Sequence, residues 1–176
     1  MNNCFRFLFL LSLVLVVPLT AREQFRAGAY AMDITPEKFP VPMVGSMTAK
    51  FAHSAHDPLH ARCLVLDNGE TTLAFAIVDS CLIPREIWDA AKENAARRTG
   101  IPVTNILGAA THTHTAVCVE PAFQSEPDKD YISFLKERIA QGIVEAHARL
   151  QPARIGWAVG NCPVSVFNRR WYMDTG

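Results

Sequence analysis

The chain has 176 residues, of which 17 are basic and 17 acidic, so its formal net charge is zero. A balanced charge gives no general attraction to nucleic acid or to an acidic surface, which argues against a nucleic-acid-binding class. An apolar content of 49% is ordinary for a globular domain that carries a targeting segment.

Residues 1–21 have the features of a signal peptide. Arg6 supplies the positive charge, residues 7–17 form an apolar run that only Ser12 interrupts, and Ala21 is a small residue at a plausible cleavage point. The run is shorter than the roughly 20 residues that span a bilayer, which favours a cleaved signal over an uncleaved anchor. We therefore expect a mature domain of residues 22–176, secreted or periplasmic, with no integral membrane span after cleavage.

Export would remove Cys4 and leave four cysteines in an oxidising compartment, where three disulfide pairings are possible. Their spacing matches no metal-binding or redox motif. We favour buried free thiols, with disulfides as the alternative, for Cys63, Cys81, Cys118 and Cys162.

The first expected strand covers residues 25–36, and residues 36–58 read as a long loop because they are rich in Pro, Gly and Ser without a sustained period. Loops of this length usually border a site. Three histidines lie in or just after it, but nothing aligns them on one face. We expect solvated loop groups, with a substrate or metal role as the alternative, at His53, His56 and His60.

A hairpin is predicted next, with strands at residues 62–67 and 71–79 around the turn dipeptide Asn68-Gly69. The apolar run 72–78 is typical of a central strand buried on both faces. A helix from Pro84 to about residue 98, stopped by Gly100, leads to a short buried strand at 106–110.

This strand–helix–strand order predicts a right-handed crossover between parallel strands, whose carboxyl ends meet at one sheet edge. Ligands bind beyond that edge, where Asp79 should emerge beside His112 and His114. If extended geometry continues, both imidazoles point into one space and could bind a divalent metal; otherwise they are surface loop histidines. Asp79 would orient an imidazole or, equally, cap the helix.

A second helix is expected from Asp128 to about Leu150, followed by strands at 154–159 and 164–171. The fold class is therefore α/β, with a mixed, partly parallel sheet and flanking helices. Near the end, Arg169 could grip an oxyanion or carboxylate through two parallel bonds, or could be a surface arginine.

The Thr-His-Thr-His after a small-residue strand resembles the neutral/alkaline (non-lysosomal) ceramidase family. So do the segments 27–36 and 56–62, and the Phe167-Asn168-Arg169 sequence. The resemblance runs over roughly residues 25–176 and implies the incomplete N-terminal portion of a larger ceramidase-type domain. It implies His112 as a ligand of Zn²⁺, His114 as its catalytic neighbour and Arg169 on the substrate side.

Two departures from the family pattern matter. Ceramidases continue with a Ser-Gly-Pro-Gly type of turn after the histidines, whereas this chain has Thr115-Ala116-Val117-Cys118-Val119. The family's other zinc ligands and its catalytic serine lie beyond the Asn-Arg, and this sequence stops at Gly176. We expect weak or no zinc binding by this chain alone.

The resemblance implies an exported zinc-dependent amide hydrolase that splits ceramide or a related N-acyl lipid into fatty acid and amine. This chain would supply only its N-terminal part, with the missing C-terminal portion as a possible partner. The alternative is a non-catalytic truncated relative that acts as a folding or binding module.

Overall fold

The structure is a computed structural model that describes residues 24–166, 170 and 172–174. The expected signal peptide (1–21) and Arg169 lie outside the described residues. No helix in the described part of the chain is both long enough and apolar enough to span a membrane.

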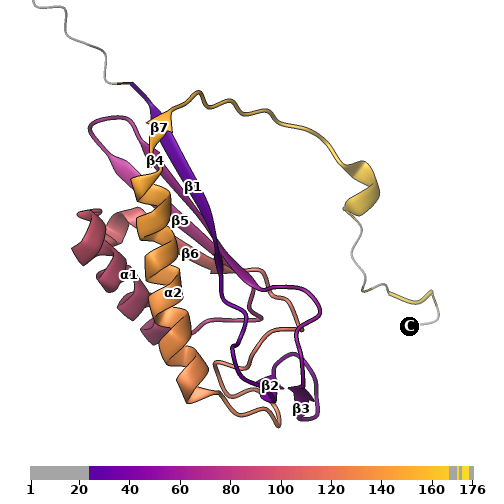
Figure 1. The fold of residues 1–176 in the computed structure, drawn as a ribbon. Coiled ribbons are helices and arrows are strands. Elements are labelled where there is room, and N and C mark those ends of the chain that lie inside the picture. The colour runs from indigo at the N-terminus through magenta and orange to yellow at the C-terminus, as the bar shows by residue number, and fades with distance from the viewer. Residues whose placement is uncertain (1–23, 167–169, 171, 175–176) are drawn as a thin grey trace, which may run out of the picture.

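A five-stranded sheet with the order β6-β5-β4-β1-β7 forms the body of the molecule (Figure 1). Its β5 and β6 strands are parallel and the other neighbours are antiparallel, so the expected mixed, partly parallel sheet is confirmed. The strands are β1 (Arg26–Asp33), β4 (His60–Asp67), β5 (Thr72–Val78), β6 (Ile106–Ala110) and β7 (Gln151–Pro152).

The predicted hairpin and crossover are both present. In the β4–β5 turn, Asn68 Oδ1 accepts hydrogen bonds from the backbone N–H groups of Glu70 and Thr71. Helix α1 (Arg85–Thr99) follows Pro84 and ends at Gly100, whose φ of 78° is the left-handed conformation that glycine adopts without strain. The short 3-10 helix η1 (Val103–Asn105) then leads into β6.

Helices α1 and α2 (Lys129–Ala148) cover the same face of the sheet (Figure 1). Two glycines allow this close approach. A Cβ on Gly142 of α2 would lie 2.8 Å from the Cys63 Sγ, and one on Gly108 of β6 would lie 2.2 Å from the Trp88 ring of α1. The core lies between this face and the helices.

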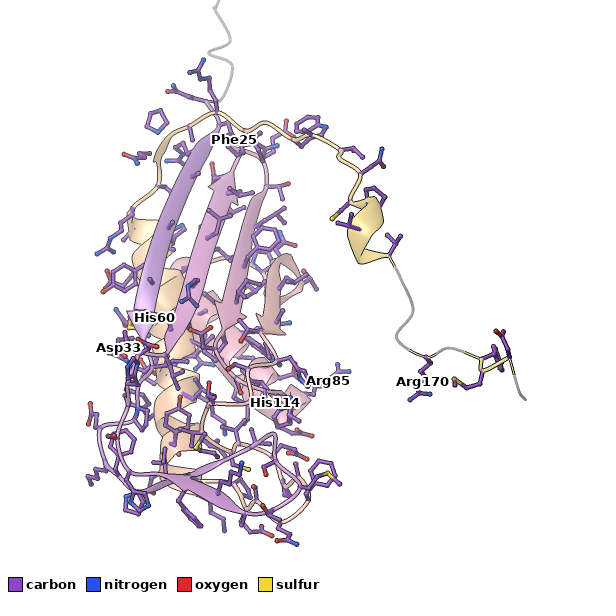
Figure 2. All side chains as sticks on the ribbon, turned by 90° about the vertical axis from the view of Figure 1, so that its right-hand side faces the viewer. Phe25, Asp33, His60, Arg85, His114 and Arg170 are labelled. Atoms are coloured by element: carbon purple, nitrogen blue, oxygen red, sulfur yellow. The ribbon has the colours of Figure 1, made fainter. Side chains whose placement is uncertain are left out.

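The opposite face of the sheet is apolar and open, as Figure 2 shows with the strands in front of α2. Side chains on β4, β5 and β6 alternate between the two faces, and those on the open face keep 38–52% of their surface exposed: Leu64, Leu73, Ile77 and Leu107. The prediction that β5 is buried on both faces is therefore wrong for the described residues, because both helices lie on one side.

The segment 36–58 is more ordered than the expected loop. It contains β2 (Val41–Met43) and β3 (Lys50–Ala52), which form a small antiparallel sheet. Backbone hydrogen bonds join it to the chain after the histidine pair: Val44 N–H donates to the Ala116 carbonyl, and Cys118 N–H donates to the Pro42 carbonyl. The segment therefore packs beside the expected site.

The strand expected at 154–159 is absent, and the one expected at 164–171 is absent from its described start. Strand β7 stops at Pro152, and the backbone from there runs away from the sheet (Figure 1). The alternating Ile155, Trp157 and Val159 are 59%, 87% and 97% exposed, since no strand among the described residues pairs with this stretch. The described start of the second expected strand is instead the 3-10 helix η2 (Pro163–Ser165), and residues 167–169 and 171 lie outside the described part.

Candidate metal centre

The histidine pair leaves the sheet at the shared carboxyl edge of β5 and β6. Thr111 N–H donates to the Val78 carbonyl and His112 N–H donates to the Ser80 carbonyl, each at 2.9 Å. These bonds continue the parallel pairing of the two strands past their ends. His112 is therefore held against the segment that leaves β5, as the crossover argument predicts.

The two imidazoles do converge, but not through extended backbone. His112 has φ of 63°, in the left-handed region, so the chain turns at this residue and the expected alternation is wrong. The two Nε2 atoms nevertheless lie 3.5 Å apart. The rings meet edge to face, with centroids 5.0 Å apart and an interplanar angle of 78°.

A backbone carbonyl fixes the state of the His112 ring. Its Nδ1 lies 2.7 Å from the Cys81 carbonyl oxygen, which can only accept a hydrogen bond. Nδ1 therefore carries the proton in the neutral ring, and the lone pair is on Nε2. This is the arrangement in which a histidine is prepared for a metal, and its Nε2 faces His114.

His114 is positioned by a glycine that the sequence analysis did not single out. A Cβ at Gly45 would lie 2.4 Å from His114 Cγ, so the loop can pass this close to the ring only without a side chain. Gly45 itself has φ of 106°. The positive φ and the contact both require glycine here.

The pair fits zinc. Two nitrogens at about 2.0–2.1 Å from a tetrahedral zinc are roughly 3.3 Å apart, close to the observed Nε2–Nε2 separation of 3.5 Å. A third potential ligand lies beside them: ligand atoms of Cys81, His112 and His114 all lie within 4.8 Å of one another. Cys81 is 5% exposed, and burial raises the pKa of its thiol.

Sequence reasoning missed Cys81 as a member of this group. Its spacing to the other cysteines carried no information. The usable indication was its place two residues after Asp79, in the segment that leaves β5 at the histidine edge.

Asp79 has partners other than those expected. Its Oδ2 accepts hydrogen bonds from His60 N–H at 2.9 Å and from Arg62 Nη1 at 2.8 Å. It does not cap α1, whose N-cap residue is Pro84. Asp79 therefore neither orients an imidazole of the pair nor caps the helix. It joins the end of β5 to the start of the antiparallel strand β4 through its Oδ2.

The three histidines of the loop region separate into two kinds. His53 is exposed, and the His56 side chain is 97% exposed beside Asp57, so both are solvated as expected, but His56 also lines the cavity described below. His60 is instead the first residue of β4, partly buried, and its Nδ1 has no hydrogen-bond partner among the described residues. The expectation is wrong for His60, because the strand begins earlier than predicted.

A cavity of about 470 Å³ lies beside the histidine segment: Thr113 and Thr115, on either side of His114, line it, although His112 and His114 themselves do not. The segment 36–58 supplies most of its wall, including Val41 and Met43 of β2 and Ala52 of β3. Asp79 adds a polar group. Apolar side chains make up much of the remaining lining, including Phe39, Val41, Met43, Leu59 and Val117.

The expected arginine cannot be placed here. Arg169 lies outside the described residues. Its neighbour Arg170 is exposed on the C-terminal segment, away from His114 (Figure 2).

No family model matches the sequence, and no curated protein matches it significantly. Solved ceramidase structures do match the fold. The neutral ceramidase from Pseudomonas aeruginosa has a TM-score of 0.66 at 23% identity, over 73% of this chain and 22% of that chain. A ceramidase complexed with C2 has a TM-score of 0.61 at 24% identity, with the same coverage. This chain therefore spans about a fifth of the length of the ceramidases it matches, and it has the fold of that part of a ceramidase structure.

Proposed function

We propose that this chain supplies part of the metal site and the substrate cavity of an exported, zinc-dependent amide hydrolase of the ceramidase type. Its substrate is ceramide or a related N-acyl lipid, and its products are a fatty acid and an amine. The observation that carries the proposal is the imidazole pair, with Nε2 atoms 3.5 Å apart, at the carboxyl edge of the parallel strands of a ceramidase-like fold.

His112 would be the metal ligand and His114 its catalytic neighbour, and each is positioned by a nearby group. The Cys81 carbonyl holds the proton of His112 at Nδ1 and so leaves Nε2 free, while Gly45 leaves room for the His114 ring. A bound zinc would supply a Lewis acid for the amide carbonyl and lower the pKa of a bound water toward neutrality. By resemblance, Arg169 would contact the substrate.

The cavity beside the histidines suits one end of such a substrate. Its apolar lining, which includes Phe39 and Val117, matches a hydrocarbon chain, and Thr113, Thr115 and Asp79 offer polar groups for the amide. Burial of each methylene there contributes about 0.8 kcal/mol, so a few ordered carbons suffice to orient the amide. Binding in this cavity would hold the scissile bond next to the imidazoles.

The test uses the longest natural reading frame that contains this chain, loaded with zinc, and a ceramide with a fluorescent acyl chain. We expect release of the fluorescent fatty acid, and His112→Ala should lower the rate at least a hundredfold. His53→Ala is the matched control, because His53 is an exposed histidine of the neighbouring loop and should leave the rate unchanged. Equal activity of the His112→Ala and wild-type proteins would refute the proposal.

The open apolar face of the sheet favours a second candidate, a non-catalytic module that packs against a partner. Under this alternative the purified full-length protein releases no fatty acid with or without zinc, yet its solubility depends on a bound partner. Hydrolysis that requires His112 decides for the enzyme.

A further inference from the structure

We propose that Cys81 is a metal ligand together with His112 and His114, so that this chain holds a three-ligand Cys-His-His site of its own. The inference extends the metal site of the proposed function but requires no hydrolysis. It goes beyond the resemblance, which implies only His112 as a zinc ligand in this part of the chain.

The first support for this site is the short distance between its ligand atoms. The Cys81 Sγ lies 3.7 Å from His112 Nδ1, and one ligand atom from each of the three residues lies within 4.8 Å of the others. Sulfur and nitrogen ligands of a tetrahedral zinc are roughly 3.5 Å apart. A separation of up to 4.8 Å exceeds this spacing by at most about 1.3 Å, which side-chain rotation can close.

The positions of Cys81 and His114 around the His112 ring determine which side chain must move when a metal binds. The thiol lies on the Nδ1 side, whereas His114 lies on the Nε2 side. Rotation of the Cys81 side chain would bring its sulfur toward the Nε2 side, and the His112 ring would keep its hydrogen bond to the Cys81 carbonyl. Both imidazoles are exposed, so the rings have room for this adjustment.

The second support is the chemistry of the ligand atoms, one sulfur and two imidazole nitrogens. Thiolate and imidazole together select zinc and similar borderline metals over magnesium or calcium, which prefer oxygen ligands. Three protein ligands with one open position are the pattern of catalytic zinc sites rather than closed structural ones. The cavity lined by Thr113 and Thr115, the neighbours of His114, would supply a substrate to that open position.

A third ligand also changes the expected affinity. The sequence predicts weak zinc binding because it offers two imidazoles separated by one residue. A thiolate from a different segment adds a strong ligand, and it links the turn after β5 to the turn after β6. We therefore expect one-to-one binding by the metal-free chain without any residue beyond Gly176.

Cobalt(II) is the test ion, since it replaces zinc and reports thiolate ligation as an intense near-ultraviolet charge-transfer band. Titration of the reduced, metal-free chain should produce this band at one equivalent. Cys81→Ser should abolish the band and weaken binding at least tenfold, and His112→Ala should abolish binding. The control is Cys118→Ser, because Cys118 packs with Cys81 and Val44 in one buried cluster but is outside the ligand group.

Several results would overturn the inference. They are a band that survives in Cys81→Ser, a band lost in Cys118→Ser but not in Cys81→Ser, one-to-one binding with no thiolate band, or no binding at all. If the substituted chain does not fold, cadmium NMR of the wild-type chain decides, because thiolate ligation moves the cadmium resonance strongly downfield. Hydrolysis by the longer protein that depends on His112 but not on Cys81 would leave the proposed function intact and refute only the role of Cys81.

Discussion

Substitution of Gly45 by alanine should separate the two imidazoles while both histidines are kept in the sequence. The added Cβ would lie 2.4 Å from His114 Cγ and 2.6 Å from its Cβ, where ordinary contacts begin near 3.4 Å. His114 must therefore move by about an ångström, since the backbone around φ of 106° has little room to yield. The Nε2–Nε2 separation of 3.5 Å would then be lost.

The expected magnitude has two parts. A positive φ at a non-glycine residue costs about 1–3 kcal/mol, which for a domain of this size lowers the Tm by about 3–10 °C. Displacement of a ligand costs about tenfold or more in metal affinity, as disturbance of supporting groups commonly does. Gly100→Ala is the matched control: its φ of 78° carries similar strain, but nothing lies within 4 Å of the added Cβ.

NMR of the imidazole protons measures the effect in the metal-free chain. The edge-to-face contact shifts the ring resonances of both histidines, and Gly45→Ala should remove this shift while Gly100→Ala keeps it. Cobalt titration of the same samples follows the affinity. Unchanged ring shifts and unchanged cobalt affinity in a folded Gly45→Ala chain would show that this glycine does not position His114, and the geometric reasoning would fail.

Three further outcomes are expected. The hydrogen bond from Thr72, with a smaller contribution from Arg26, holds the pKa of Asp67 below its ordinary value; Asp67→Asn should therefore cost about 1–3 kcal/mol at neutral pH. Because folding lowers this pKa, the stabilisation from Asp67 is lost as the pH falls through the lowered value. The Tm values of the wild-type and Asp67→Asn chains should therefore differ at pH 7 and become equal in acid. The open sheet face should make the isolated chain aggregate or require a partner, and Leu107→Gln should raise its soluble fraction, measured by light scattering, with little change in Tm; a clean, cooperatively melting wild-type monomer would contradict this. Exported protein should begin near Arg22 by N-terminal sequencing, whereas soluble cytoplasmic protein with an intact Met1 would contradict export.

Much of the fold follows from local sequence features. Turn and helix-end residues have backbone preferences that depend only on the local sequence. The hairpin and α1 lie where such residues predict them, at Asn68-Gly69, Pro84 and Gly100. The stretch 154–159 shows the limit of the same reasoning. Its alternation is strand-like, but a strand also needs a partner, and the described residues offer none beyond the bond from Ala153 N–H to the Phe25 carbonyl.

The geometry of the candidate site is harder to predict from sequence than the fold, because it depends on contacts between segments far apart in the chain. The pairing of His112 with His114 was predicted from extended alternation, yet the left-handed turn at His112 brings the rings together. Asp79 was placed at the correct edge, but Arg62 and the His60 N–H on the neighbouring strand take its carboxylate. No sequence pattern predicts that Gly45 passes over His114.

The metal centre and the open face depend on the remainder of a larger protein to different degrees. The centre is built from segments that this chain already pairs: Thr111 and His112 are hydrogen-bonded to the exit of β5, and Val44, beside Gly45, is hydrogen-bonded to Ala116. The open face has no such internal partner in the described part, since both helices lie on the other side. Substitutions on that face, such as Leu107→Gln, should therefore change solubility and leave metal binding unchanged. If they changed both to the same extent, the site would depend on what covers the sheet, and this chain could not hold a preformed centre.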